Sequence, residues 1–221
     1  MNKLLIPALA LCGALVVPLV AQDKGKNDDK PVPAPAPAAK NEPYKVGSTV
    51  DEKLTLTDLD GKAIDFKSLR GKVVIVHFWS DRCPAEIHGN PVFKKLETYY
   101  ADRKDVVLIG VVANQNELGA APAKDADYSK CYTNFRDKIK ETGFTHKICA
   151  DHGNKLSDRF GATCTPHCFV IDAKGVLAYA GALDDDQRGS KGEAAKVYVR
   201  NAADALLAGK TVEVKETKPY G

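Results

Sequence analysis

The residue in this sequence that is best suited to covalent chemistry is Cys83. It follows a nearly continuous apolar run from Val73 to Trp79 and a short polar turn, and Pro84 comes directly after it. An uninterrupted apolar run is typical of a strand buried on both faces, and proline is well tolerated at the first position of a helix. The pattern therefore predicts that Cys83 lies where a strand passes into a helix, at the end of the helix dipole that stabilises a thiolate.

Two charged neighbours act in opposite directions on such a thiolate. Arg82 favours it through its positive charge, whereas Glu86, three residues further along the predicted helix, opposes it. Glu86 itself has two interpretations: it caps the start of the helix, as in a capping box, or it handles protons during catalysis. For Cys83 the alternative is a spare thiol packed behind a helix. The succession of strand, turn, Cys-Pro and helix favours the reactive role.

The segment from Gly71 to Pro91 resembles the active-site segment of thioredoxin-fold redoxins. Its run Gly-Lys-Val-Val-Ile-Val-His-Phe-Trp, followed by a short turn and Cys-Pro, is similar to the alkyl hydroperoxide reductase / thiol-specific antioxidant (AhpC/TSA) and cytochrome-maturation thioredoxin group. Pro91 matches the proline that kinks the first long helix of thioredoxins. Most relatives carry Cys-x-x-Cys, whereas this chain has Cys-Pro-Ala-Glu from Cys83 to Glu86. The second active-site cysteine is absent.

The resemblance also places a second loop opposite Cys83. The stretch from Gly161 to Asp172 is similar to the family's cis-proline loop and the strand after it. Pro166 is therefore expected to be cis, with Thr165 presenting its backbone to whatever docks at Cys83. Cys164 is either a resolving thiol within reach of Cys83 or a small buried loop residue. The candidate site residues are Cys83, Pro166, Thr165, Cys164, Trp79 and Glu86.

The remaining chain predicts an α/β domain. Residues 54–66 alternate apolar and polar side chains and predict a hairpin. Further strands are predicted at 105–113, 146–150, 167–172 and 176–180, and helices after Cys83 and at 127–142, 154–161 and 192–207. This order predicts a central mixed β-sheet flanked by helices, with an N-terminal hairpin extension. The resemblance implies that the fold is the thioredoxin fold.

The front of the chain has the pattern of an export signal. Residues 1–21 combine a charged start with an apolar segment, which indicates a secretory signal peptide or, alternatively, an uncleaved membrane anchor. Residues 22–43 are rich in Lys, Asp, Pro and Ala and predict a solvated linker. The redoxin domain is expected at 44–209 and a tail at 210–221. We expect an exported protein, periplasmic or extracellular after cleavage.

Composition and cysteine content restrict the possible functions. The 32 basic and 29 acidic residues are interspersed, with a net charge of +3, which gives no support to nucleic-acid binding. Loss of Cys12 with the signal would leave an odd number of cysteines and hence at least one thiol free or used chemically. Cys131 and Cys149 lie on elements that are expected to pack together, either as a disulfide or as two buried thiols.

Three functions remain open. In the first, an exported thiol-disulfide oxidoreductase or antioxidant thiol peroxidase uses Cys83 to attack a disulfide-bearing protein or a peroxide, and an external thiol, a thioredoxin-type reductant or Cys164 resolves the product. This function requires no bound cofactor or metal. Ser80 is a weak substitute for the Pro and Thr that shape the peroxide pocket of peroxiredoxins. The second is a copper- or other metal-binding module, and the third a redox-inactive adaptor.

The histidines bear on the metal hypothesis. A copper site would have to combine Cys164, His167 and Cys168, but strand alternation directs the last two to opposite faces. His77 and His167 are expected to be structural residues within strands. The remaining histidines, at 88, 146 and 152, are expected at the surface.

Overall fold

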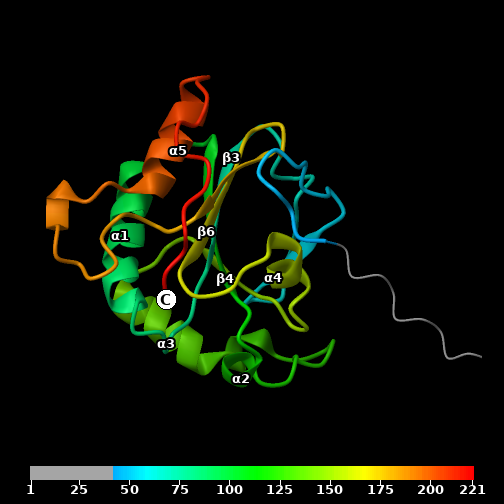
Figure 1. The fold of residues 1–221 in the computed structure, drawn as a ribbon. Coiled ribbons are helices and arrows are strands. Elements are labelled where there is room, and N and C mark those ends of the chain that lie inside the picture. Colours follow the sequence, from blue (N-terminus) through cyan, green and yellow to red (C-terminus); the bar gives the residue numbers. More distant parts are fainter. Residues whose placement is uncertain (1–41) are drawn as a thin grey trace, which may run out of the picture. The chain divides into compact units, whose positions relative to one another are not determined.

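The computed structural model describes residues 42–221, so the predicted signal segment (1–21) and nearly all of the predicted linker (22–43) lie outside the described residues. One mixed seven-stranded sheet has the order β2-β1-β5-β4-β3-β6-β7. The strands are β1 (Thr55–Asp58), β2 (Ala63–Asp65), β3 (Val73–Phe78), β4 (Val106–Val112), β5 (Lys147–Ala150), β6 (His167–Ile171) and β7 (Leu177–Gly181). The predicted mixed sheet and N-terminal hairpin are confirmed (Figure 1).

Strand β3 runs through the middle of the sheet. It pairs in parallel with β4 and antiparallel with β6. All six of its residues are buried because both faces of the sheet are covered. Val73 and Ile75 point into one core and Val74 and Val76 into the other, and burying each side chain contributes roughly 1.5–3 kcal/mol. This explains why the strand has a continuous apolar run in the sequence.

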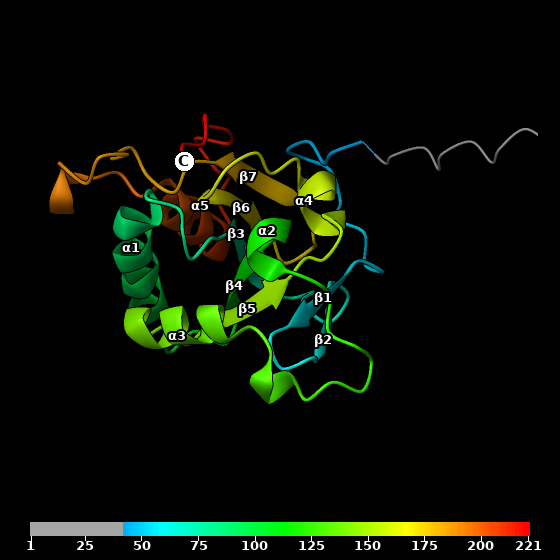
Figure 2. The same ribbon diagram turned by 90° about the horizontal axis from the view of Figure 1, so that it is seen from below.

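Helices cover the two faces unequally. The first core packs beneath α1 (Glu86–Tyr99), α3 (Thr133–Thr142) and α5 (Tyr198–Leu207). The second core lies beneath α4 (Lys155–Phe160) and the N-terminal hairpin (Figures 1 and 2). No helix among residues 42–221 is long and apolar enough to cross a membrane.

Two of the predicted helices are interrupted and one short helix was not predicted. The 127–142 stretch splits into a 3-10 turn (Tyr128–Lys130) and α3, with Tyr132 between them in the left-handed region at φ 58°. The Arg136 side chain donates to the carbonyl oxygens of Tyr128 and Cys131, which satisfies the broken turn. The 192–207 stretch is likewise a 3-10 turn (Gly192–Ala194) followed by α5, and α2 (Gln115–Leu118) lies in the predicted loop.

The cysteines of the described part carry no disulfide: all five have free thiols. Of the two alternatives for Cys131 and Cys149, the disulfide is not formed, and a buried thiol is found only at Cys149. Burial raises the pKa of Cys149 to about 12. Cys131 is half-buried, and its Sγ lies 3.5 Å from the Asp127 carbonyl oxygen.

Candidate active site

The turn between β3 and Cys83 is built around the side chain of Ser80. The Oγ atom of Ser80 accepts hydrogen bonds from the backbone amides of Arg82 and Cys83, each at 3.1 Å. The same hydroxyl donates to Oε1 of Glu117 at 2.8 Å. These bonds turn the chain sharply after β3 and leave Cys83 half-buried.

The thiol of Cys83 meets the loop before β6. Its Sγ donates to the carbonyl oxygen of Thr165 at 3.0 Å, a contact between residues 82 positions apart. The Thr165–Pro166 peptide bond is cis, as predicted. The structure thus brings Cys83, Thr165 and Pro166 together.

Helix α1 begins later than the sequence predicted. Pro84 and Ala85 form a tight turn in which the amide of Glu86 donates to the Cys83 carbonyl oxygen at 3.0 Å. The regular ladder starts only when Gly89 donates to Ala85. Pro84 is therefore not the first helical residue. Cys83 lies two residues before Ala85, the N-cap of α1, close to the free amides and the positive end of the helix dipole, which favour an anion.

Glu86 is buried beneath this site. Only 2% of the residue is exposed, and within residues 42–221 neither carboxyl oxygen has a hydrogen-bond partner of normal geometry. Its Oε2 lies beside Gly89, where an added Cβ would come within 2.8 Å of it and 3.5 Å of Pro166. The capping interpretation is wrong, because α1 has no side-chain cap in the described structure.

Burial determines the charge state of Glu86. Loss of water around the carboxyl raises the pKa of Glu86 well above its usual value, and the charge of Glu117 acts in the same direction. The nearby backbone of Ser80 acts against this, but more weakly. The environment thus favours the neutral carboxylic acid, which is a proton donor.

The two cysteines near Pro166 occupy different environments. Cys164 is half-buried, and burial raises its pKa, with the charges of Cys83 and Glu86 adding to the effect. Cys168 is fully buried in the core beneath α1, and its pKa is raised well above the usual value by burial. Both environments favour the neutral thiol.

The geometry around β6 gives no support to a metal site. His167 packs on Phe169, on the face opposite Cys168. Its Nδ1 lies 3.3 Å from the amide of Thr163, and burial lowers its pKa to about 4. In the described part of the chain, no three His, Cys, Asp or Glu side chains lie close enough together to hold a metal ion.

Trp79 belongs to the core and not to the reactive surface. It is fully buried, and its rings pack against Phe135 and Phe144. The indole Nε1 donates to Oδ1 of Asn90 at 2.9 Å. The side chain therefore fixes the end of β3 against α1, and it acts on Cys83 only through the backbone.

A group of polar residues behind the Ser80 turn was missed from the sequence. The carboxyl of Glu117 accepts from Ser80 and from Nδ2 of Asn114, the latter at 2.7 Å, and Asn134 donates to Asp81 at 3.0 Å. Burial and the neighbouring Asp81 carboxyl raise the pKa of Glu117. No sequence signal identified Glu117, because it lies in a stretch that predicted only a loop.

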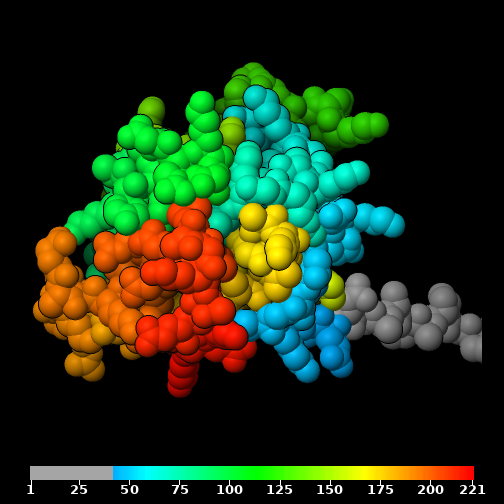
Figure 3. Space-filling model, turned by 90° about the horizontal axis from the view of Figure 1, so that it is seen from above, coloured from blue at the N-terminus to red at the C-terminus, as the bar shows by residue number. Residues whose placement is uncertain are grey.

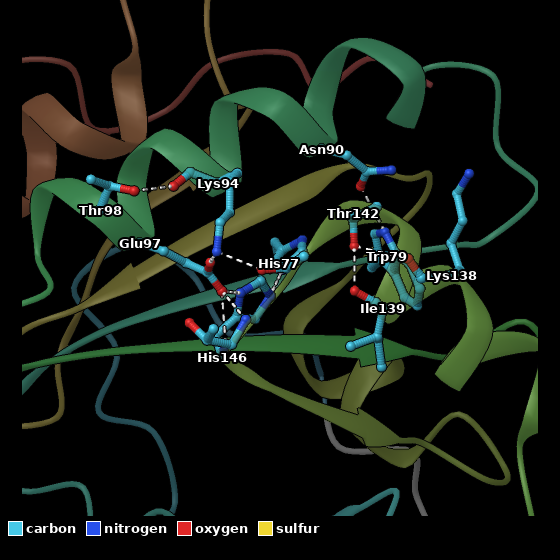
Figure 4. A network of polar contacts seen from close by, with 12 residues as sticks. His77, Trp79, Asn90, Lys94, Glu97, Thr98, Lys138, Ile139, Thr142 and His146 are labelled. Carbon is cyan, nitrogen blue, oxygen red and sulfur yellow. Dashed lines mark hydrogen bonds and ion pairs between the residues drawn. The ribbon is translucent and has the colours of Figure 1, made fainter.

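A second buried polar cluster lies between α1 and the sheet (Figure 4). The Nε2 atoms of His77 and His146 are 3.0 Å apart, and Nδ1 of His146 lies 2.6 Å from Oε1 of Glu97. Lys94 pairs with the other carboxyl oxygen at 2.7 Å. The prediction of a surface position for His146 is wrong: its side chain is only 4% exposed. The side chain enters the core because it can pair with Glu97.

Comparison with known sequences identifies the family. Residues 32–198, more than half of the chain, match the sequence model of the redoxin family. The chain is a redoxin. The predicted resemblance to AhpC/TSA-type redoxins is confirmed by this match.

The redoxin is also similar to named thiol enzymes over part of their length. It is 28% identical to the thiol-disulfide oxidoreductase ResA of Bacillus thuringiensis over 120 residues, which cover 54% of this chain and 60% of ResA. A second ResA, from Halalkalibacterium halodurans, is 29% identical over 122 residues, with 55% of this chain and 60% of that protein covered. The match thus spans about 60% of the relatives' own length.

Solved structures confirm the thioredoxin fold. A hypothetical protein from Sinorhizobium meliloti 1021 superposes with a TM-score of 0.65 at 22% identity, covering 80% of this chain and 93% of that one. An uncharacterized conserved protein from Geobacillus kaustophilus gives 0.63 at 22% identity, with 80% and 95% covered. At this level of identity the likeness establishes the α/β fold alone.

Proposed function

We propose that this redoxin is a thiol-disulfide oxidoreductase in which Cys83 is the single active-site cysteine that attacks the substrate. The observation that carries the proposal is the position of the Cys83 thiol. It is half-exposed at the N-terminus of α1, and it is held 3.0 Å from the carbonyl oxygen of Thr165, next to cis-Pro166. A cysteine at a helix N-terminus favours the thiolate, the species that attacks disulfides.

The reaction proceeds by exchange of sulfur partners. The Cys83 thiolate attacks one sulfur of a disulfide, a Cys83–sulfur bond forms, and the original sulfur–sulfur bond breaks. The other substrate sulfur leaves as a thiolate and takes up a proton. Glu86, buried one turn further on and favoured in its neutral form, is suited to donate that proton and to be reprotonated from water. We assign Glu86 this role.

The mixed disulfide must then be resolved by another thiol. Glu86 occupies the place of the second cysteine of a Cys-x-x-Cys site, and a carboxyl group cannot attack a disulfide. An external thiol or a thioredoxin-type reductant would attack the mixed disulfide, release Cys83 as its thiolate and leave as a new disulfide with the substrate sulfur. Cys164, in the loop that contacts Cys83, is the internal candidate. Its thiolate would attack the Cys83 sulfur, form a Cys83–Cys164 disulfide and release the second substrate sulfur as a thiolate, and an external thiol would then reduce that disulfide.

The proposal includes export, which the pattern of residues 1–21 supports. Peroxide reduction by Cys83 is the weaker candidate activity. Ser80, the only stand-in for a peroxide-binding hydroxyl, donates to Glu117 and accepts from two backbone amides. Its hydroxyl is therefore engaged in shaping the turn.

The test is a mass-spectrometric and kinetic comparison of cysteine variants. Cys83→Ser should lower thiol-dependent disulfide reduction by on the order of 10³-fold or more. Cys164→Ser should leave the attack in place but let the Cys83 mixed disulfide accumulate, if Cys164 resolves it. Cys131→Ser is the matched control, since it removes another half-buried thiol from a different part of the fold. Unchanged turnover of disulfides and peroxide in Cys83→Ser would contradict the proposal and favour a redox-inactive adaptor.

A further inference from the structure

The last residues of the chain lie on the backbone that faces Cys83. A Cβ added to Gly221 would overlap the carbonyl oxygen of Thr165 and come within 3.0 Å of its amide nitrogen. Gly221 therefore rests directly on the Thr165 peptide group, whose carbonyl oxygen also accepts from the Cys83 thiol. We call residues 216–221 the strap. Figure 1 shows it in red, running along the sheet and ending close to the start of α1.

The first half of the strap is fastened to β7. Glu216 forms a parallel bridge with Ala180, and the amide of Thr217 donates to the Ala180 carbonyl oxygen at 3.1 Å. The Oγ1 atom of Thr217 accepts from the amide of Ala182 at 2.8 Å and lies 2.6 Å from the hydroxyl of Tyr179. The space-filling view shows that the chain after α5 forms part of the molecular surface (Figure 3).

The second half of the strap is fastened through a tyrosine. The hydroxyl of Tyr220 donates to Oδ1 of Asp184, whose side chain is fully buried. The other oxygen of Asp184 is 2.9 Å from Nε2 of His88, which lies on α1. The strap is thus connected to the helix that follows the nucleophile.

Beside the strap, a groove of about 440 Å³ opens next to the cis-proline loop. Its lining includes Cys164 and the exposed Lys218. The lining residues are Thr163, Cys164, Gln187, Lys218, Pro219, Tyr220 and Gly221. This size suits a small molecule and not a folded protein segment.

We propose that the strap makes this site selective for small disulfides and the thiols they form, and excludes extended polypeptides. An extended peptide would need the exposed main-chain groups of the loop before β6 to lie alongside it. Gly221 covers those groups at Thr165. A small disulfide can reach the half-buried Cys83 without displacing the strap. The inference rests on the proposed exchange at Cys83 and specifies its substrate class.

The test compares how fast Cys83 attacks three disulfides in the full chain. The probes are oxidised glutathione, uncharged hydroxyethyl disulfide and the polypeptide insulin, each followed by mass spectrometry of the Cys83 adduct. Tyr220→Ala and Thr217→Val loosen the two ends of the strap. Each should raise the rate with insulin relative to glutathione disulfide at least tenfold.

The matched control is Tyr99→Phe, which removes a tyrosine hydroxyl bonded to a different aspartate, Asp204, away from the strap. It should leave the insulin-to-glutathione ratio within twofold of the wild type. If the insulin-to-glutathione ratio also stays within twofold of the wild type in both Tyr220→Ala and Thr217→Val, the inference is wrong.

A second measurement separates this inference from the exchange reaction itself. Cys83 is alkylated with iodoacetamide and with a maleimide attached to a long peptide, neither of which requires a disulfide. If the strap covers the site, loosening it should accelerate the peptide maleimide at least tenfold more than iodoacetamide. This result would support the strap even if Cys83 exchanged with no disulfide, whereas equal acceleration of both reagents would count against it.

Discussion

Helix α1 carries two glutamates that the fold treats in opposite ways. Glu97, near its end, accepts from the backbone amides of Thr145 and His146 at 2.7 Å each and pairs with the His146 ring and with Lys94. Glu86, at its start, is more deeply buried and has no hydrogen-bond partner within residues 42–221. One helix thus contains a fully hydrogen-bonded carboxylate, Glu97, and a buried carboxyl group without hydrogen-bond partners, Glu86.

The difference appears in their proton affinities. Burial alone would raise the pKa of Glu97, but the hydrogen bonds from His146, Lys94 and the two amides reverse this and lower it. Nothing comparable offsets burial at Glu86, and its pKa is raised. A buried carboxylate whose oxygens are all hydrogen-bonded holds structural elements together, so we assign Glu97 a structural role. A buried carboxyl group without hydrogen-bond partners keeps an exchangeable proton, so we assign Glu86 a chemical role.

Removing the saturated carboxylate should give the largest effect on stability. Glu97→Ala leaves two amides and the His146 ring without an acceptor, and we expect a loss of about 3 kcal/mol in the free energy of unfolding, measured with urea at pH 7. The control is Glu141→Ala, because Glu141 pairs with Lys138 at the same i,i+3 spacing but is 69% exposed. That variant should lose less than about 0.5 kcal/mol. Equal losses would contradict the contrast.

Glu86→Gln should raise the free energy of unfolding, whereas Glu97→Ala lowers it. Folded Glu86 retains its proton above pH 4.5, where an unfolded glutamate releases it, so the wild type loses stability as pH rises between 4.5 and the raised pKa of Glu86. The slope approaches about 1.4 kcal/mol per pH unit within that window. Glutamine has no such proton, and the variant should show a flatter dependence of unfolding free energy on pH.

The same variant tests the proposed proton transfer. Glu86→Gln should slow turnover of disulfides roughly 10²-fold, the usual contribution of a positioned acid. Glu97→Gln, which changes the other glutamate of α1 in the same way, should leave the rate of disulfide attack by Cys83 within a few-fold of the wild type. A Glu86→Gln variant that keeps both its pH-dependent stability and its full turnover would show that Glu86 is neither protonated nor catalytic.

Local sequence patterns sufficed for most of the elements and for the position of Cys83 between a strand and a helix. The apolar run of β3 reports burial on both faces within a single strand, and the Cys-Pro pair marks the place where the chain leaves it. The resemblance supplied cis-Pro166. The strand and the Cys-Pro turn are encoded by residues adjacent in sequence. The cis-proline loop was identified because the family that has the Cys-Pro segment also has this loop.

The partners of buried polar groups could not be predicted in the same way. Ser80 bonds to Glu117, 37 residues away, and Glu97 to His146, 49 residues away, because β4, β5 and their connections bring these segments together. Hydrophobic periodicity carries no information on which polar side chains meet across a sheet. The apolar periodicity also continues unchanged through Tyr132, where the helix is interrupted. The left-handed backbone of this residue ends the helical hydrogen bonding without changing which side chains are apolar.

The smallest predicted effect is the loss of stability at acidic pH that arises in the buried cluster of His77, His146, Glu97 and Lys94. Burial, and next the charge of His146, lower the pKa of His77, whereas Glu97 acts against them. Folded His77 therefore stays neutral where an unfolded histidine, with a pKa near 6.5, gains a proton, so stability falls as pH drops. For one such group the loss between pH 7 and pH 6 is about 0.7 kcal/mol. Burial lowers the pKa of His167 to about 4, which adds a similar contribution. Between pH 7 and pH 6, the unfolding free energy of His77→Leu in urea should fall by about 0.7 kcal/mol less than that of the wild type, and an equal change would mean that His77 is already charged in the fold.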